Sequence, residues 1–473
     1  MGDISSTILN LVARTAAEAA PALPAGSMER KNLLILQRLA VKALADQGVT
    51  RESFHGAGAS LAEARPRIER ALSAAGKALP VEWPAGEMSP GEVADALSRA
   101  AQLLGEVDSA EARELFWQCI DLEAGINRRG EDFYQSRMAE YSSAGAGGAA
   151  VTIDLDRLAG FLSEQAGEPV TIRSARNVPG GFSKLTVIVE LEKAGPYPPR
   201  IVVRLDRKGG YLNTTVADEF EVISALHKEG VAVPRPLASD PTGAVLGDPF
   251  IVVEARPGRT IGDMFNPPEP SAATNESVAA ALAGLHSVPL DRMGDALRGT
   301  ELSTREQAAD WLMESKTAWQ GLATPSAIMD AGFAWLEDNL HLAEGVPVVM
   351  HGDLGLNNML IEDERLTALL DWEFVRAGHA GYDLGYFHCM AVPLGSWEDF
   401  LVAYGRAGGV VPAPEVLDFF ILFANVRLAT MVWQGATAFG RGQLTDLVWA
   451  NPGANDQRVA TMRVAEQLRK VAG

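Results

Sequence analysis

Hydrophobic residues in the first part of the chain recur at helical spacing. Ile8, Leu11 and Val12 share one face of a helix, and Leu33 and Leu36 begin the same pattern again. Apolar side chains three or four positions apart lie on one side of an α-helix. The pattern continues, between glycine and proline breaks, to about position 141. It predicts a segment that is almost wholly helical.

A run of small residues follows this segment. Positions 142–148 contain only serine, alanine and glycine, whose side chains are too small to build a core. We therefore predict a linker at 144–150, preceded by a helical accessory domain at 1–143. With a core of its own, that domain should be removable without unfolding the rest of the chain.

Beyond the linker the apolar pattern changes to short runs that are typical of β-strands. These runs predict strands at 170–175, 185–191, 201–205 and 250–253. An amphipathic helix is predicted at 216–228. Helical patterns dominate again further on, with short strand-like runs at 346–350, 359–361 and 366–370. The prediction is an α+β fold with a small β-rich lobe at 151–257 and a larger helical lobe at 258–473.

Composition indicates a folded chain and narrows the classes of partner. Hydrophobic residues make up 47% and charged residues 22% of the 473 residues, as in globular proteins. The net charge is −20, and most of it falls after position 258. An acidic surface repels phosphate backbones, so we expect no nucleic acid partner.

Targeting signals and membrane spans are not expected either. The N-terminus has no basic cluster followed by an apolar run, which a secretory signal would have. The most apolar stretch, 416–433, is interrupted by Asp418, Asn425 and Arg427, which indicates a buried helix. The 2 cysteines of the chain are too few for a disulfide framework. We therefore predict a cytoplasmic protein that does not bind a membrane.

Two polar motifs carry the strongest chemical signal. Asp353 follows a predicted strand within His-Gly-Asp, Asn358 lies five residues later, and Asp371 ends the next predicted hairpin within Asp-Trp-Glu. Phosphoryl transfer to a hydroxyl needs an acceptor for the proton and a metal ion that bridges the nucleotide phosphates. Asp353 can accept the proton, and the oxygens of Asn358 and Asp371 suit Mg²⁺. The motifs favour a phosphotransferase that depends on ATP and Mg²⁺.

These motifs resemble those of the aminoglycoside-phosphotransferase-like family, which includes choline, fructosamine and macrolide kinases. Positions 351–358 match its H-G-D-x-x-x-x-N element, and 370–373 match its I/L-D-W-E element. The resemblance covers about 155–470 and leaves the N-terminal helical segment outside. It implies a protein-kinase-like fold of two lobes, and transfer of the γ-phosphate of ATP to a hydroxyl of a small molecule.

A glycine-rich turn is expected to cover the nucleotide phosphates. Gly180, Gly181 and Ser183 lie between two predicted strands, where a kinase-like fold carries its phosphate-covering loop. Glycines let backbone N–H groups approach anionic oxygens closely. The turn resembles the family's G-G-x-S element, and Ser183 is a further candidate for phosphate contact.

A basic residue is expected to bind the nucleotide phosphates, and a carboxylate is expected to hold that basic residue in place. Arg204 stands where most kinases carry a lysine, with Lys184 and Lys208 as alternatives. Its planar fork can bind phosphate, but with a geometry different from that of an ammonium group. Helical spacing puts Glu219 on the apolar face of its helix and Glu221 about 200° away from it. Glu219 is therefore the predicted partner of Arg204.

The remaining site predictions rest on the resemblance. Backbone groups of Glu254 and Ala255 are expected at the hinge between the lobes, against the adenine edge. Glu373 is assigned to a second metal ion or a substrate amine. Asp383 should support the catalytic loop, and His351 should orient that loop instead of acting as the general base.

The resemblance implies that the acceptor is an amino sugar, a macrolide-like compound, another alcohol or a hydroxyacyl-CoA. The acidic charge of the helical lobe favours a neutral or cationic alcohol. A nucleotide-binding pseudokinase, whose helical domain recruits a protein, is the alternative function, because Arg204 departs from the usual lysine. Whether the chain forms a homodimer is left open.

Overall fold

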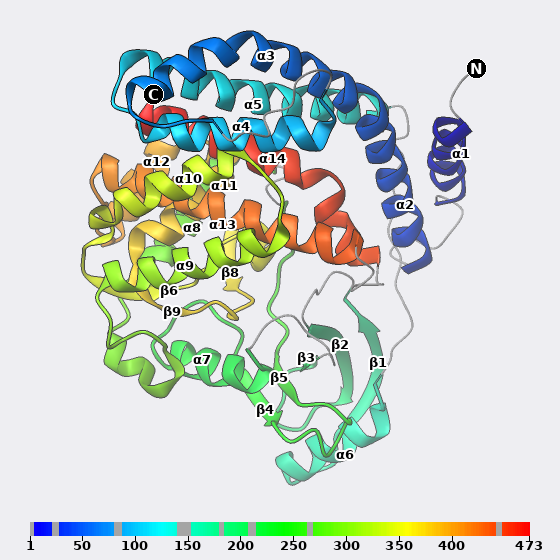
Figure 1. Ribbon diagram of the computed structural model, residues 1–473. Helices are drawn as coiled ribbons and strands as arrows, with labels where there is room; N and C mark the ends of the chain where they lie inside the picture. Colours follow the sequence, from blue (N-terminus) through cyan, green and yellow to red (C-terminus); the bar gives the residue numbers. More distant parts are fainter. Residues whose placement is uncertain are drawn as a thin grey trace.

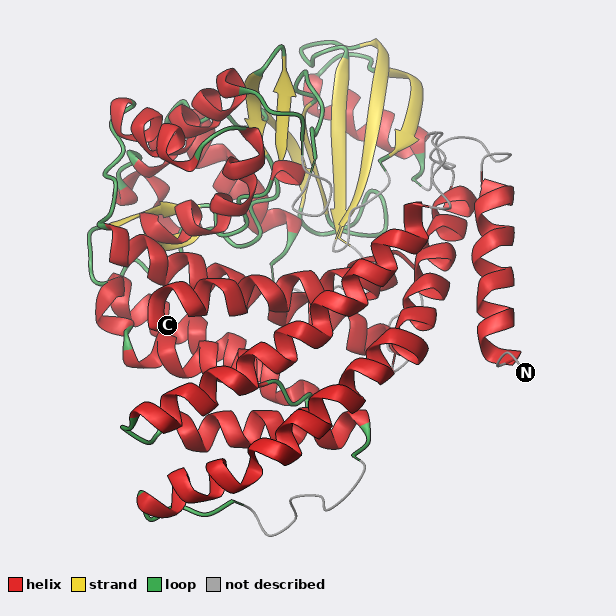
Figure 2. Cartoon of the chain, turned by 90° about the horizontal axis from the view of Figure 1, so that it is seen from above, coloured by secondary structure: helices red, strands yellow, loops and turns green. Residues whose placement is uncertain are grey.

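The computed structural model describes residues 4–20, 28–79, 88–139, 153–178, 184–206, 214–262, 268–440 and 447–473. N-terminal helices come first along the chain, then a small lobe built on a sheet, then a larger helical lobe (Figure 1). The long strands gather in one region, and helices fill most of the remainder (Figure 2). The predicted α+β fold of two lobes, preceded by an all-α segment, is confirmed.

The small lobe contains an antiparallel sheet with the strand order β1-β2-β3-β5-β4. Its strands are β1 (Thr171–Asn177), β2 (Lys184–Lys193), β3 (Arg200–Asp206), β4 (Pro236–Asp240) and β5 (Phe250–Glu254). Successive side chains of a strand point to opposite faces, so a central strand contributes to two layers. Strand β4, at the edge beside β5, was not predicted from the apolar pattern.

Two helices, α6 (Leu155–Ala166) and α7 (Val216–Lys228), cover the sheet. In β5, Phe250 and Val252 belong to the apolar cluster of α6, whereas Ile251 belongs to the cluster of α7. The alternation along β5 therefore puts the two helices on opposite faces. Because the α7 cluster continues into the large lobe, this face joins the two lobes.

The large lobe is mainly helical. Its helices are α8 (Ala272–His286), α9 (Thr304–Leu322), α10 (Ala327–Asp338), α11 (Ala380–Leu394), α12 (Trp397–Arg406), α13 (Pro414–Gly440) and α14 (Leu447–Ala472). Its strands are β6 (Pro347–Met350), β7 (Met359–Glu362), β8 (Arg365–Leu369) and β9 (Arg376–His379). Strand β6 pairs with β9, and β7 pairs with β8, both antiparallel. These short pairs carry the polar motifs.

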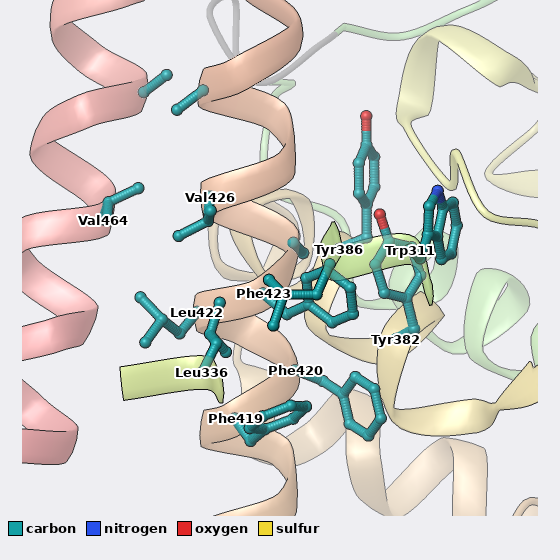
Figure 3. Close-up of a cluster of buried hydrophobic side chains, with 14 of the residues drawn as sticks. Trp311, Leu336, Tyr382, Tyr386, Phe419, Phe420, Leu422, Phe423, Val426 and Val464 are labelled. Atoms are coloured by element: carbon teal, nitrogen blue, oxygen red, sulfur yellow. The ribbon is translucent and has the colours of Figure 1, made fainter. Parts of the chain in front are cut away.

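Helix α13 forms the centre of this lobe. Phe419, Phe420 and Phe423 are at most 1% exposed, and Figure 3 shows them among aromatic and aliphatic side chains of neighbouring helices. Of the described residues, only the segment Pro414–Ala438 is long and apolar enough to cross a membrane, and 67% of its most apolar window is buried in the protein. Such burial is that of a core helix, as the sequence predicts.

The N-terminal helices meet the large lobe on the side away from the five-stranded sheet, except the first, which stands apart from that lobe and packs on the second (Figure 1). They are α1 (Ile4–Ala19), α2 (Met28–Ala45), α3 (Arg51–Ala74), α4 (Pro90–Gly105) and α5 (Ala110–Ala139). Helices α4 and α5 pack on α10, and α5 also packs on α14. One cluster of buried apolar residues runs from α3, α4 and α5 into the large lobe.

The expectation that the N-terminal segment has a core of its own is therefore wrong. Amphipathic spacing shows that a helix has an apolar face, but it does not show which element covers that face. The predicted residue boundaries of the domains stay predictions, since the linker at 144–150 lies outside the described residues.

A carboxyl group of α5 caps helix α10 across this shared core. Glu123 accepts a hydrogen bond from the Ser326 hydroxyl at 2.5 Å and another from the Ile328 N–H at 3.0 Å. Burial raises the pKa of Glu123 from 4.5 to about 7, although both hydrogen bonds oppose this rise. The nearby charge of Asp330 raises the pKa of Glu123 further.

We expect Glu123 to make the stability of the protein depend on pH. Above the unfolded pKa of 4.5 and below about 7, the folded carboxyl keeps a proton that the unfolded one has lost. Its contribution to the free energy of unfolding therefore falls as pH rises through this range. Calorimetry should show that the melting temperature of the wild type, minus that of Glu123→Gln, decreases between about pH 5 and about pH 8.

The difference between the two proteins is the quantity to follow. Burial lowers the folded pKa values of His379 and His388, so both side chains also make stability depend on pH, but equally in wild type and variant. A difference in melting temperature that stays constant over this range would contradict the role given to Glu123.

Candidate active site

The two polar motifs meet at one end of the β6–β9 pair. Met350, the last residue of β6, pairs with Arg376, the first residue of β9. The loop after Met350 and the loop before Arg376 therefore lie side by side. At Gly352, φ is 82° and an added Cβ would lie 2.6 Å from the Phe374 carbonyl oxygen. Only glycine fits this close approach.

Asp353 is held in place by two hydrogen bonds. Its Oδ1 accepts from the Tyr386 hydroxyl at 2.5 Å, and its Oδ2 accepts from Nδ2 of Asn358 at 2.8 Å. Burial raises the pKa of Tyr386 well above its usual value, so the phenol keeps its proton and acts as the donor. Asp353 is itself only half-buried. The loop thus presents a fixed carboxylate that remains within reach of a substrate.

His351 connects the two loops through its ring. Its Nε2 lies 2.9 Å from the carbonyl oxygen of Leu370, and its Nδ1 accepts from the N–H of Asp353 at 3.2 Å. A carbonyl oxygen can only accept, so these contacts assign the ring proton to Nε2. With both nitrogens engaged by the backbone, His351 has the position of an orienting group.

Asp383 fixes the backbone of the loop 351–358, which we call the catalytic loop because it carries the candidate base Asp353. It is fully buried and accepts hydrogen bonds from the N–H groups of His351 at 2.7 Å and Gly352 at 2.9 Å. Nε2 of His286 lies 3.2 Å from its Oδ2. Burial alone would raise the pKa of Asp383, but its contacts with His286 and the loop hold this pKa below the ordinary value. The carboxylate therefore stays charged and fixes the backbone before Asp353.

The candidate metal ligands are neighbours. The N–H of Leu370 donates to the carbonyl oxygen of Asn358 at 2.8 Å, which puts Asp371 beside the strand that follows Asn358. The amide nitrogen of Asn358 donates to Asp353, and its oxygen accepts from Nδ2 of Asn357 at 2.9 Å, which leaves one lone pair of this oxygen for a metal ion. Asp371 is 28% exposed and uses only Oδ1 in its ion pair with Arg204. Two hard oxygen donors of this kind fit Mg²⁺.

Asp371 also has an unusual backbone conformation, with φ at 67°. A residue other than glycine is uncommon in this left-handed region, and such conformations gather at functional sites. Here the turn directs the carboxylate towards the small lobe.

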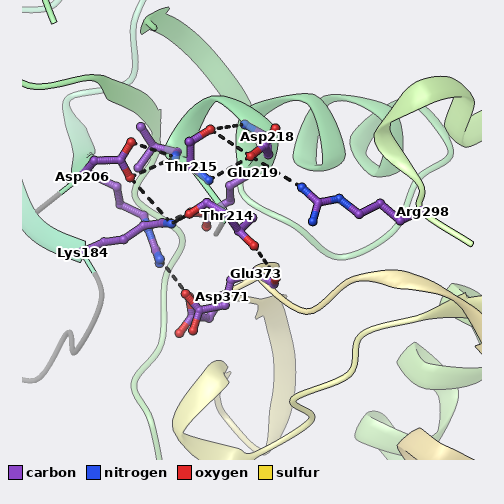
Figure 4. Close-up of polar contacts among 11 residues, drawn as sticks. Lys184, Asp206, Thr214, Thr215, Asp218, Glu219, Arg298, Asp371 and Glu373 are labelled. Atoms are coloured by element: carbon purple, nitrogen blue, oxygen red, sulfur yellow. Dashed lines mark hydrogen bonds and ion pairs between the residues drawn. The ribbon is translucent and has the colours of Figure 1, made fainter. Parts of the chain in front are cut away.

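Arg204 of β3 forms ion pairs with Glu219 of α7 and with Asp371, the two carboxylates labelled in Figure 4. Its Nη2 donates to Oδ1 of Asp371 at 2.9 Å, and its Nε lies 3.3 Å from Oε2 of Glu219. The latter contact is an ion pair without hydrogen-bond geometry. Burial alone lowers the pKa of an arginine, but the charges of Glu219 and Asp371 raise that of Arg204. Glu219 is 1% exposed, so the face chosen from helical spacing is the inward one.

Lys184, one alternative to Arg204, contacts neither Glu219 nor Asp371 among its described partners. Its buried Nζ donates to the carbonyl oxygen of Thr214 at 2.8 Å and lies 3.7 Å from Asp206. The Thr214 hydroxyl in turn donates to the carbonyl oxygen of Glu373 at 3.0 Å (Figure 4). Lys184 therefore fixes a segment of the small lobe against the loop of Asp371.

Strand β5 ends at Glu254, one residue beyond the predicted run 250–253, and the N–H groups of Glu254 and Ala255 already have acceptors. The N–H of Glu254 donates to the carbonyl oxygen of Arg235, and the N–H of Ala255 donates to that of Arg200. These two donors are not available to adenine, so the prediction for Glu254 and Ala255 is limited to their carbonyl oxygens. Sequence alone could not show this, since both acceptors lie on other strands or loops.

Four predicted residues lie outside the described residues. They are Gly180, Gly181 and Ser183 of the phosphate-covering turn, and Lys208, one alternative to Arg204. Glu373 is half-buried next to Asp371, and its negative charge acts on Arg204.

Sequence reasoning missed Tyr386 and Arg427. Tyr386 lies three residues after Asp383 on α11, so helical spacing could have placed both on one face towards the catalytic loop. Arg427 is 4% exposed, and its Nη1 lies 3.4 Å from the carbonyl oxygen of Gly352. Nothing in the sequence around Arg427 points to that contact, because 75 residues separate the two.

Comparisons with known proteins show the family to which the chain belongs. Residues 174–420 match the phosphotransferase enzyme family. Acyl-CoA dehydrogenase family member 11 of Rattus norvegicus is 29% identical over 236 residues, which cover 45% of this chain and 30% of that protein. Its counterpart in Mus musculus is 31% identical over the same shares. The chain thus spans about a third of the length of the curated relatives it matches.

A solved structure of a presumed aminoglycoside phosphotransferase from Ralstonia eutropha JMP134 has the same fold. It is 19% identical, with a TM-score of 0.52, and the match covers 67% of this chain and 99% of the other. At this identity the likeness concerns the fold alone. The family match, in contrast, takes in more than half of the 473 residues and both polar motifs. The chain belongs to the phosphotransferase enzyme family.

Proposed function

We propose that this protein transfers the γ-phosphate of ATP to a hydroxyl group of a small molecule. The proposal rests on the position of Asp353. Tyr386 and Asn358 fix its carboxylate, and the loop that contains it lies beside the loop of Asp371. A base, an amide oxygen and a second carboxylate within one pair of loops are the groups that phosphoryl transfer to a hydroxyl needs.

Each group has a chemical task in this proposal. Asp353 accepts the proton of the acceptor hydroxyl while the oxygen of that hydroxyl bonds to the γ-phosphorus of ATP. The bond between the γ-phosphorus and the β–γ bridging oxygen breaks, and ADP is released. Asn358 and Asp371 would hold Mg²⁺, which when bound neutralises charge on the phosphate oxygens. Arg204, fixed by Glu219, supplies a guanidinium for the phosphates.

A screen for ADP release tests this function. The full chain is incubated with ATP, Mg²⁺ and separate pools of amino sugars, macrolides, simple alcohols and hydroxyacyl-CoA compounds. We expect ADP release above the acceptor-free background from at least one pool. The Asp371→Ala variant should lose this release together with Mg²⁺-linked nucleotide binding in calorimetry, since it lacks a metal ligand.

The same screen distinguishes the alternative function. A pseudokinase regulator would bind ATP but would release no ADP with any pool. Nucleotide binding that is unchanged in Asp371→Ala, combined with no turnover by the wild type, would favour the regulator and count against a phosphotransferase.

A further inference from the structure

A group of arginines lies at the same end of the β6–β9 pair as Asp353. Arg376 opens β9 opposite Met350, the residue that leads into the catalytic loop. Arg427, from α13, approaches the carbonyl oxygen of Gly352 at 3.4 Å, directly before Asp353. The phosphotransferase mechanism proposed above uses neither arginine.

Both arginines stack on one indole ring. The guanidinium carbon of Arg376 lies 4.1 Å from the centroid of Trp311, and that of Arg427 lies 4.3 Å from it. Arg427 is also 4.5 Å from the ring centroid of Phe374 and donates to the Tyr382 hydroxyl at 3.1 Å. An aromatic face attracts a cation, so stacking holds both planes in fixed orientations.

Neither arginine of this group has a directly paired carboxylate in the part of the chain that the structure describes. Among the described residues, no carboxylate oxygen lies within the 4.0 Å of an ion pair from Arg376 or Arg427. Nε of Arg376 is buried without a hydrogen-bond partner. A buried donor or charge without a partner is costly.

One carboxylate and two other arginines act on the charge of Arg376. Burial lowers the pKa of Arg376, the attraction of Glu314 raises it, and the repulsion of Arg427 and Arg298 lowers it again. Arg298 is close because its carbonyl oxygen accepts from the N–H after Arg376, at Ala377. Glu314 is exposed to solvent, where water screens its charge.

We propose that Arg376, held against Trp311 beside Arg427, binds an oxyanion of the acceptor substrate, either a carboxylate or a phosphate. This inference rests on the proposed phosphotransferase function and names the class of its acceptor. A guanidinium fork matches the two oxygens of such a group. Bound there, the anion fixes the acceptor beside the catalytic loop, so that its hydroxyl reaches Asp353.

This proposal departs from the neutral or cationic alcohol that net charge favours. Exposed charges act over roughly 8 Å at physiological salt, so the acidic surface of the lobe has little effect inside the site. Arg376 is half-buried and Arg427 is buried, so their charges have a larger effect on the acceptor, because burial reduces screening.

Binding of small anions tests the proposal without a known substrate. The probes are inorganic phosphate, 3-hydroxybutyrate and its uncharged amide, added to the full chain in the presence of Mg²⁺ and a non-hydrolysable ATP analogue. Calorimetry measures the dissociation constants for the wild type and for Arg376→Met. The matched control is Arg406→Met, which removes an exposed arginine paired with Glu276.

We expect both anions to bind the wild type and the control, and Arg376→Met to weaken them about tenfold or more, the loss of one charge-assisted contact. The amide should bind none of the proteins measurably. Absence of anion binding to the wild type, or equal anion binding by wild type and Arg376→Met, would overturn the proposal. Melting temperatures of the variants show whether the lobe stays folded.

Failure of the proposed function gives a different result. If the chain does not bind the ATP analogue, or binds it and never releases ADP from ATP, the phosphotransferase proposal fails. The anion measurements still report on Arg376 in that case, because they do not require turnover.

Discussion

Replacing Asp353 by asparagine is expected to lower kcat by about 10²–10⁴-fold, the usual contribution of a general base. The affinity for ATP should stay within a few-fold of the wild type. An amide has nearly the size of the carboxylate and can still accept the hydrogen bond from Tyr386, but it cannot take the proton of the acceptor hydroxyl. Steady-state ADP release, with the acceptor found by the pooled screen, measures the loss, and calorimetry measures ATP binding.

The change also affects one contact of the loop. In the wild type, Oδ1 of Asp353 accepts from Tyr386 and Oδ2 accepts from Nδ2 of Asn358. Asparagine at 353 has a single oxygen, which cannot occupy both acceptor positions, so the contact with Asn358 is lost. A matched control is Asp363→Asn, the same replacement at an exposed turn between β7 and β8. It should leave kcat unchanged. Near-normal kcat in Asp353→Asn would mean that another group takes the proton.

Several of the site residues that sequence predicted have positions that depend on local spacing, whereas Asp383, which contacts His351 and Gly352 from 31–32 positions away, was predicted from the family resemblance alone. Asp353 and Asn358 lie five positions apart in one loop, and Asp371 ends the adjoining hairpin. Glu219 followed from the angle between helical positions, and its 1% exposure agrees with an inward face. In each case neighbours along the chain determine the geometry.

The residues that sequence did not predict make contacts between distant segments. Tyr386 reaches Asp353 from α11, and Arg427 reaches Gly352 from α13 across 75 positions. The N–H groups of Glu254 and Ala255 are paired with acceptors elsewhere in the small lobe. Hydrophobic periodicity carries no information about such pairings, because it records which face is buried and not what lies against it.

The same limit explains the mistaken separate core of the N-terminal helices. A glycine-rich linker indicates where the chain is easily bent, but it does not prevent the segments on either side from packing together. Helices α4 and α5 bury apolar side chains against α10 and α14. Polar contacts then cross the interface, such as Glu123 with Ser326 and Arg469 with Asp121.

Removing residues 1–143 is therefore expected to unfold or aggregate most of the remaining chain. Helices α4 and α5 pack on α10, and α5 also packs on α14; buried apolar residues of all four helices belong to one cluster. Exposing one large apolar side chain costs about 1.5–3 kcal/mol. The summed cost of a few such side chains is therefore comparable to the roughly 5–15 kcal/mol that stabilises a domain. Soluble yield, size-exclusion chromatography and ATP binding compare the truncated and full chains.

A shorter deletion separates this effect from the mere loss of N-terminal sequence. Removing residues 1–20 takes away α1, which packs on α2; of its described side chains, Leu9 and Ala13 belong to a small apolar cluster shared with α2 and α5. That protein should stay soluble and bind ATP like the full chain. A 1–143 deletion that is soluble, melts cooperatively and binds ATP with the affinity of the full chain would contradict this expectation. In that case α10 and α14 would be stable without α4 and α5, and the N-terminal helices would form an independent domain.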